Sequence, residues 1–207
     1  MASRGALLRA LSHRNARIFF GASLAAWTGL WMQRVAVAWL AWELTRSAFW
    51  VGVVAFCDLA PAVIASPLAG AVADRVDRVR LAMGSQIAIA LQALAVAALV
   101  WSGGMTIGLL LVLEVLGGIA SAFAQPARQT LMPAIVPRAD LPAAVACNSL
   151  IFNVARFIGP ALAGPMIAVV GVVAAIAGNA VGFLLASVTG PLLRIPAEER
   201  RGHAASA

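Results

Sequence analysis

The amino-acid sequence predicts an all-α membrane protein with six transmembrane helices, on the basis of two observations. Hydrophobic residues make up 62% of the 207 residues and charged residues only 11%, which is less charge than a soluble domain of this size exposes. Six apolar runs are also long enough to cross the roughly 30 Å hydrocarbon core of a bilayer. The 18 glycines and 10 prolines do not weaken this prediction, because transmembrane helices tolerate both residue types. The six runs cover residues 18–42, 48–73, 81–101, 105–125, 143–170 and 172–193.

The first run follows a basic segment, residues 1–17, which raises the alternative of a cleaved signal peptide. The run is too long for a signal peptide and contains Trp27, Trp31 and Arg34, so we expect an uncleaved first helix. A polar segment, residues 194–207, follows the last run. We therefore expect one six-helix transmembrane domain over residues 18–193, with no room for a second domain.

The connections between the runs alternate in length. The short ones are residues 43–47, residues 102–104 and the turn near Gly171. The connection of residues 125–141 contains three prolines, and we expect it to hold a short interfacial helix. Pro142 is expected near the start of the fifth helix, where its missing N–H and fixed φ are tolerated.

The basic side chains are all arginines apart from two histidines, and they are concentrated on one side of the expected topology. With an even number of spans, both terminal segments share a side with the connections after the second and fourth helices. Twelve arginines fall on this side and only Arg46 on the other, so the positive-inside rule places both termini in the cytoplasm. The +7 net charge is then a topology signal, and the partner it indicates is the lipid bilayer and not a nucleic acid. We expect an integral, multi-pass protein of a bacterial inner membrane (plasma membrane). The twelve are Arg4, Arg9, Arg14, Arg17, Arg75, Arg78, Arg80, Arg128, Arg138, Arg194, Arg200 and Arg201.

Four charged residues fall inside the expected helices: Arg34 in the first, Asp58 in the second, Glu114 in the fourth and Arg156 in the fifth. A charge near the middle of a bilayer costs about 2.5–3.5 kcal/mol on insertion scales, so each needs a partner or a water-filled cavity. Two positive and two negative groups can pair. We expect the first, second, fourth and fifth helices to line an interior, and the third and sixth, which carry amides but no charge, to face lipid. The open alternative is that the charges are structural pairs that lock the bundle.

Helical spacing places polar and aromatic residues on single faces of three helices. These residues are Ser23, Trp27, Trp31 and Arg34 in the first helix, Glu114, Gly118, Ser121 and Gln125 in the fourth, and Ser149, Asn153 and Arg156 in the fifth. A cavity with two indoles, an arginine and a glutamate would suit a bulky, partly aromatic solute. The candidates for lining it are Trp27, Trp31, Arg34, Glu114, Ser121, Asn153 and Arg156. Cys57 and Cys147 both fall within helices, where we expect packing roles and no disulfide.

The connection between the second and third helices contains Gly70-x-x-x-Asp74-Arg75-x-x-Arg78, which resembles the signature loop of the major facilitator superfamily. Further matches are Trp31-Met32-Gln33, Leu44-Thr45, Pro126-Ala127-Arg128-Gln129, Asn148-Ser149 and Phe152-Asn153. With these segments in register, residues 14–194 resemble the enterobactin-exporter-type transporters, also called transmembrane secretion effectors. The resemblance implies that the six helices form one half, the amino-terminal half, of a major facilitator fold with a 3+3 helix repeat.

The resemblance also implies a conformational latch between the two halves of such a transporter. Its residues here are Gly70, Asp74, Arg75 and Arg78. We expect Gly70 to let the second helix approach a neighbour closely, and Asp74 to cap or face a helix amino terminus. The chain departs from the family pattern at Asp77, where glycine is common, and at Val79, where a basic residue is usual.

The fifth helix contains a segment, residues 155–164, that is similar to the glycine-proline motif of antiporters in this superfamily. The matching residues are Gly159, Pro160 and Gly164. A second interpretation stays open: Ala155, Gly159 and Ala163 form a small-residue stripe of a general packing kind. We expect this stripe and the edge of the second helix at Gly70 to offer surfaces for a second copy or a second half.

The family resemblance implies a secondary active transporter: a proton-coupled exporter of siderophore-like or hydrophobic drug-like molecules, with Asp58 and Glu114 as candidate proton carriers. We expect no enzymatic activity and no cofactor or metal. The chain has no lysine for a phosphate-binding loop. Its histidines, His13 and His203, lie outside the expected helices, which argues against an intramembrane serine protease or a bis-histidine haem protein.

Transporters of this superfamily have about twelve helices in two halves, so six helices leave several alternatives open. The chain could be a truncated product, one half of a split transporter, or a protein whose homodimer rebuilds the second half. The alternative function is a non-transporting membrane scaffold or regulatory fragment, in which the charges within the helices would be structural.

Overall fold

The computed structural model describes residues 12–73 and 75–193, with the exception of the side chains of Arg78 and Thr130. Within these residues the chain forms six long helices and two short 3₁₀ helices, and no strand. The all-α prediction is confirmed. The helices are α2 (Arg14–Thr45), α3 (Ala48–Ala73), α4 (Arg78–Trp101), α5 (Ile107–Ile135), α6 (Leu141–Val169) and α7 (Val172–Thr189), with the 3₁₀ helices η1 (Arg138–Asp140) and η2 (Gly190–Leu192).

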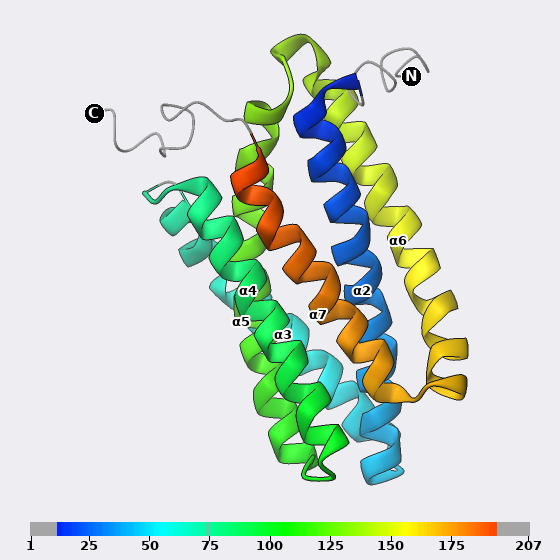
Figure 1. The fold of residues 1–207 in the computed structure, drawn as a ribbon. Helices are drawn as coiled ribbons and strands as arrows, with labels where there is room; N and C mark the ends of the chain where they lie inside the picture. The colour runs from blue at the N-terminus through cyan, green and yellow to red at the C-terminus, as the bar shows by residue number, and fades with distance from the viewer. Residues whose placement is uncertain (1–11, 74, 194–207) are drawn as a thin grey trace.

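Five of these helices, α3 to α7, are long and apolar enough to cross a membrane by length and composition. α2 is the least apolar of the six, because it carries arginines and a glutamate along its length. It nevertheless packs in the middle of the bundle, against α7 on one side and α6 on the other (Figure 1). The fold is therefore an all-α membrane bundle of the kind that forms one half of a major facilitator fold.

The helix boundaries agree with those that the sequence predicts, except at the end of α5. The short connections after α2, α4 and α6 are confirmed, and Pro142 lies in the first turn of α6. The proline-rich connection of residues 125–141 was expected to hold a separate interfacial helix, and this is wrong. α5 instead continues through Pro126 and Pro133 to Ile135, and only one turn of 3₁₀ helix, η1, separates it from α6.

The helices lie side by side in the order α6, α2, α7, α4, α5, α3 (Figure 1). The expectation that α4 and α7, the third and sixth helices, mainly face lipid needs correction. Each exposes one apolar face, but their other faces supply much of the core, including Ala90, Ala93, Ala175 and Ala180. Alanine allows the helix backbones to approach closely, so these two helices are packed more deeply than α3.

Glycines mark the closest approaches between helix backbones. A Cβ atom added at Gly29 of α2 would lie 2.7 Å from the Asn179 Cα of α7, and one at Gly182 would lie 2.7 Å from the Ala25 carbonyl oxygen. No side chain fits at such distances, so α2 and α7 form a tight seam. We call this contact, at Gly29, Gly182, Ala25 and Asn179, the α2–α7 seam.

The small-residue stripe of α6 is also used inside the bundle. Ala155 and Ala163 are buried, and a Cβ at Gly159 would lie 2.5 Å from the Trp31 Cβ of α2. The expectation that this stripe faces a second copy is therefore wrong, because α2 already covers it. The expected close approach at Gly70 is also absent: a Cβ there would meet no atom within 4 Å among the described residues.

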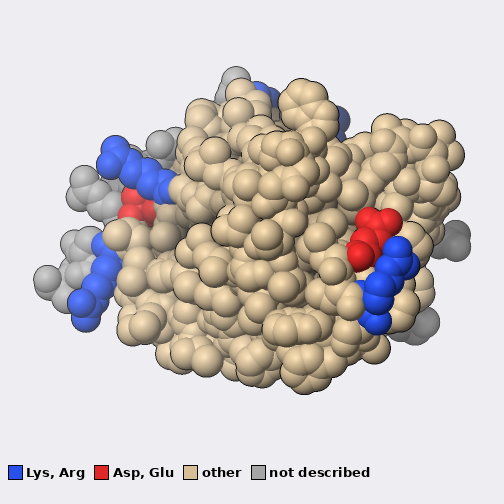
Figure 2. Space-filling model, turned by 90° about the horizontal axis from the view of Figure 1, so that it is seen from below, with Lys and Arg blue, Asp and Glu red and all other residues tan. Residues whose placement is uncertain are grey.

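The two ends of the described chain meet at one end of the bundle. Arg14 donates a hydrogen bond to the Leu192 carbonyl oxygen, and His13 lies 3.0 Å from the Asp140 carboxylate. The opposite end holds the three short connections, where Arg46 and Gly171 adopt positive φ angles. Seen from this opposite end, charged residues are confined to small groups near the edge of the surface (Figure 2).

Candidate functional site

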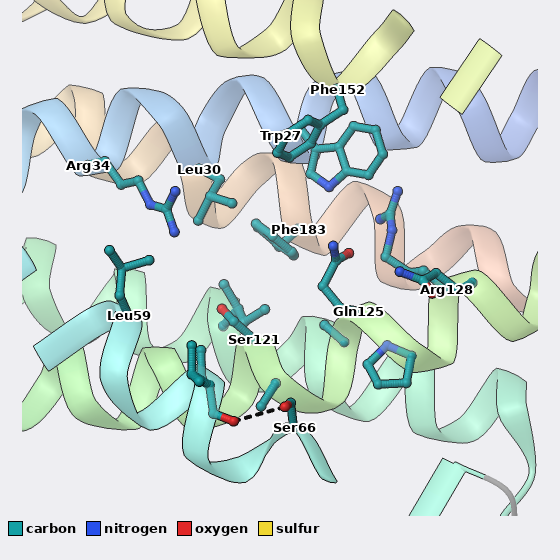
Figure 3. Close-up of a pocket in the computed structure, with 17 residues that line it drawn as sticks. Trp27, Leu30, Arg34, Leu59, Ser66, Ser121, Gln125, Arg128, Phe152 and Phe183 are labelled. Atoms are coloured by element: carbon teal, nitrogen blue, oxygen red, sulfur yellow. Dashed lines mark hydrogen bonds between the residues drawn. The ribbon is translucent and has the colours of Figure 1, made fainter. Parts of the chain in front are cut away.

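A pocket of about 500 Å³ opens between α2, α3 and α5 (Figure 3). Its walls are mainly apolar and aromatic. Three of the predicted cavity residues, Trp27, Arg34 and Ser121, line it. The full lining is Trp27, Leu30, Arg34, Leu59, Ala62, Val63, Ser66, Ile89, Ser121, Ala122, Ala124, Gln125, Pro126, Arg128, Gln129, Phe152 and Phe183. We call it the large pocket, because it is larger than the pocket around Asp58 and Glu114.

An aromatic cluster joins α2 to α6 beside the large pocket. The Phe152 ring lies edge-on to both indoles, with its centroid 5.1 Å from that of Trp27 and 6.0 Å from that of Trp31. Edge-to-face contacts of this kind stabilise by about 0.5–1.5 kcal/mol beyond the burial of area. Trp27 and Trp31 come to one face because they are four residues apart on α2, as their spacing predicts.

A second pocket of about 470 Å³ brings together the four charged residues that the sequence places inside the helices. Arg34, Asp58, Glu114 and Arg156 all line it, together with Trp31. We call it the charged pocket. The sequence singled out these four as the charged residues inside the helices, and the structure places them around one cavity.

Only one of the expected ion pairs forms within this set. The Arg34 guanidinium lies 3.0 Å from the Asp58 carboxylate and 4.8 Å from the Trp31 ring centroid. Glu114 is buried and forms no ion pair among the described residues; its carboxylate accepts a 3.1 Å hydrogen bond from the Gln92 amide. The expected pairing of two acids with two arginines is therefore half right.

Glu114 is the end of a chain of three buried amides. Asn179 donates to Gln33 at 2.6 Å, Gln33 donates to Gln92 at 3.0 Å, and Gln92 donates to Glu114. These residues come from α7, α2, α4 and α5, so the chain crosses the core and ties four helices together. In an apolar core each amide needs its partner, since an unpaired buried polar group costs about 1–3 kcal/mol. We call this set the amide chain.

The polar face of α6 is exposed in the described chain. Arg156 lies over Trp31, with 5.3 Å between the guanidinium carbon and the ring centroid, and has no ion pair among the described residues. Asn153 is also exposed and donates only to the Ser149 carbonyl oxygen of its own helix. It is not among the residues that line the two pockets, although we expected it there.

Arg128 is a functional candidate for which the sequence predicted only a position on the cytoplasmic side. It lies on α5 and lines the large pocket, with only 5% of its surface exposed. Its guanidinium donates to the Ser23 hydroxyl and lies 4.7 Å from the Trp27 ring centroid. The sequence predicted a loop over residues 125–141, and an arginine in a cytoplasmic loop is solvated and needs no partner. Arg128 was therefore not recognised as a buried charge.

The two latch residues that the structure describes in full, Gly70 and Arg75, form no contact that shows a latch. Asp74 lies outside the described residues, as does the side chain of Arg78; Gly70 has open space around it and Arg75 is exposed. Asp77, which departs from the family pattern, caps α4: its carboxylate accepts a 2.9 Å hydrogen bond from the Arg80 backbone N–H. Asp77 is therefore the N-cap residue of α4, and the capping role expected of Asp74 stays a prediction.

In the antiporter-like segment of α6, one of the two matching glycines packs closely against another helix. Gly159 contacts α2, Pro160 lines a shallow pocket beside Trp31 and Arg34, and Gly164 has no neighbour within 4 Å of an added Cβ. Both cysteines of the described chain are free, as expected.

A membrane bundle with an aromatic pocket and a nearby cluster of charges can be compared with known families. The family model described as "Transmembrane secretion effector" matches residues 6–202 of the chain. The chain belongs to the transmembrane secretion effector family. This is a major facilitator branch, as the loop and helix signatures implied, and the relatives that the chain matches are transporters.

Several curated relatives are transporters. The chain is 32% identical to the staphyloferrin A transporter of Staphylococcus aureus over 154 residues, which are 74% of this chain and 39% of that protein. It is 33% identical to the multidrug efflux pump Tap of Mycolicibacterium fortuitum over 72% of the chain and 38% of the pump. It is 24% identical to macrolide efflux protein A of Streptococcus pyogenes over 86% and 44%, respectively. The match thus spans about two fifths of the length of these relatives.

Proposed function

We propose that this chain forms the solute-binding half of a secondary active exporter, driven by a proton gradient, for siderophore-like or hydrophobic drug-like molecules. The position of Arg34 supports this best. Arg34 lines both the large pocket and the charged pocket, and it is paired with Asp58. One side chain therefore belongs both to the wall of the solute pocket and to the charge cluster that contains the candidate proton carriers.

The geometry suggests how proton and solute binding are linked. Glu114 can bind and release a proton without breaking an ion pair, because its partner among the described residues is the neutral Gln92 amide. When Glu114 is charged, the two carboxylates compete for Arg34, since Arg156, which also lines the charged pocket, lies over Trp31 and has no ion pair among the described residues. We expect the Arg34 guanidinium to shift between Asp58 and Glu114 and so to change the wall of the large pocket. Solute and proton then compete through Arg34.

Transport also needs a cover for the exposed faces of α3 and α6. Val63 and Ile64 of α3 are 71% and 76% exposed, and the polar residues Asn153 and Arg156 lie on the exposed face of α6. An arginine facing hydrocarbon is costly. We propose that a second six-helix half, supplied by a separate chain or a second copy, packs on these two helices.

We propose further that both ends of the chain lie in the cytoplasm of a bacterial cell, at the plasma membrane. Apart from Arg46, the described arginines outside the pockets gather where α2 begins, where α3 meets α4 and at η1, and these sites share one end of the bundle. Membrane-impermeant labelling of cysteines placed at Ser12 and Gly103, with Cys57 and Cys147 replaced, tests the orientation. Gly103 should react from outside the cell and Ser12 should not; labelling of Ser12 alone would reverse the proposal.

The experiment that tests the function is solute flux after reconstitution of the protein, purified from native membranes with its associated subunits, under an imposed pH gradient. A panel of aromatic solutes of both charge signs should show gradient-driven flux with the natural sequence. Asp58→Asn and Glu114→Gln should each abolish the gradient dependence while the protein remains inserted. If the double variant transported normally, neither carboxylate would couple protons, and the proposed mechanism would be wrong.

A further inference from the structure

Arg128 is buried without an acidic partner. The described ion pairs are His13–Asp140 and Arg34–Asp58, and neither includes Arg128. Its Nε atom is buried and has no hydrogen-bond partner in the described part of the chain, and its one hydrogen bond is to a neutral hydroxyl, that of Ser23. A buried charge with no counter-ion costs several kcal/mol.

Aromatic rings offset part of this cost but not all of it. The guanidinium carbon of Arg128 lies 5.3 Å from the Phe19 ring centroid and 4.7 Å from that of Trp27. Cation–π contacts contribute about 0.5–2 kcal/mol each, and they leave the N–H donors of the guanidinium unpaired. The chemical group that matches a guanidinium with a free Nε–H is a carboxylate, which accepts two parallel hydrogen bonds.

The large pocket is the cavity that leads to Arg128, and its lining has a definite charge. Among the described residues, its lining contains two arginines, Arg34 and Arg128, and no aspartate or glutamate. Arg34 is neutralised by Asp58, which itself lines the charged pocket instead. Between the two arginines lie Trp27, Phe152 and Phe183 (Figure 3). The pocket is therefore positive at the Arg128 end and aromatic in its middle.

We propose that Arg128 is the anion subsite of the large pocket, and that the solute is an anionic amphiphile with a carboxylate on an apolar, partly aromatic body. This inference rests on the proposed function, since it names the chemistry of the solute of the same pocket. The carboxylate pairs with the Arg128 guanidinium, and the body packs against Trp27 and Phe152. Gln125 and Gln129, which also line this end, supply further hydrogen bonds.

Binding of three matched probes tests the proposal on the full chain in phosphatidylcholine nanodiscs. The probes are pyrenebutyrate, pyrenebutanol and pyrenebutylamine, which share one aromatic body and differ in charge. Quenching of tryptophan emission reports their binding, because Trp27 lines the pocket. The acid should bind about tenfold more tightly than the alcohol, as expected for one charge-assisted hydrogen-bonded pair, and the amine more weakly than the alcohol. Equal affinity for acid and alcohol, or preference for the amine, would overturn the proposal.

Two variants locate the preference. Arg128→Gln should remove the tenfold advantage of the acid while leaving alcohol binding unchanged. Arg138→Gln, which removes an exposed arginine outside the pocket, should leave the acid advantage intact. A persistent acid advantage in Arg128→Gln would place the anion elsewhere. If that variant does not fold, Arg128→Lys keeps the charge but loses the fork of donors, and it should retain only part of the advantage.

The source of the anion is distinguished by lipid composition. Nanodiscs that contain phosphatidylglycerol present anionic headgroups at high local concentration, and acid binding should be unchanged in them. Loss of the acid advantage only in these discs would assign Arg128 to a lipid phosphate and overturn the solute assignment. Because these measurements report binding alone, they can fail while gradient-driven flux through Asp58 and Glu114 persists, so the two proposals are separable.

Discussion

The two sides of α2 differ in how closely they pack against the neighbouring helices. On the α7 side, Gly29 and Gly182 remove side chains so that two backbones touch, and the buried amide of Asn179 sits within the contact. On the α3 and α5 side, arginine and tryptophan side chains hold the helices apart around two pockets. Small residues thus stabilise the bundle at the α2–α7 seam, and large polar residues form the functional cavity. Substitutions on the two sides should separate stability from transport.

The largest effect is expected at the α2–α7 seam. Gly29→Ala adds a Cβ that would lie 2.7 Å from the Asn179 Cα, and the backbone cannot yield locally. We expect a loss of about 3 kcal/mol of stability, at the upper end of overpacking costs. Thermal unfolding in detergent, followed by size-exclusion chromatography, measures it. Gly21→Ala is the matched control on the same helix, because its Cβ would meet nothing within 4 Å; equal losses in both variants would mean that the seam is not tight.

A smaller loss of stability is expected from the amide chain, which connects the two sides of α2. Gln92→Leu leaves Glu114 and Gln33 without their partner, which should cost about 2 kcal/mol. Gln86 is a control on the same helix: it is buried, but its Oε1 atom has no partner among the described residues. Gln86→Leu should therefore be neutral or stabilising. Chemical unfolding of the two variants distinguishes them, and a larger loss for Gln86→Leu would contradict the role of the chain.

The smallest effect is expected on the exposed face of α6. Asn153 bonds only to its own helix and lines neither pocket, so Asn153→Ala should change stability by no more than about 0.5 kcal/mol. Binding of pyrenebutyrate to the single chain should also be unchanged. A weakened affinity would show that this face reaches the pocket. The explanation that its polar residues are covered by a second half would then lose support.

The outcome at particular residues shows what a sequence can and cannot predict. The length of the apolar runs predicted the helices, because a bilayer sets a minimum length for a transmembrane segment. The short connections then fix where one helix ends and the next begins. Trp27, Trp31, Arg34, Asp58 and Glu114 were found because charged and aromatic residues inside apolar helices are rare and costly. Helical spacing then placed the first three on one face.

The predictions that were wrong or missing concern which neighbour a helix face contacts. The stripe at Gly159 was a correct packing signal, but no periodicity says whether the partner is α2 or a second copy. The amide chain was missed because Gln33, Gln92 and Asn179 lie far apart in sequence, although isolated amides in apolar helices are a usable signal of interhelical hydrogen bonds. Arg128 was hidden because prolines suggested a loop where α5 continues.

The most direct test of a shared site for proton and solute is the release of protons when solute binds. The purified chain is placed in weakly buffered detergent solution with a pH indicator, and pyrenebutyrate is added to saturation. If solute and proton compete through Arg34, the solution should acidify on binding, and Glu114→Gln should bind the probe without acidifying the solution. Saturation of the natural sequence with no release of protons, or equal release by Glu114→Gln, would contradict the coupling through Arg34.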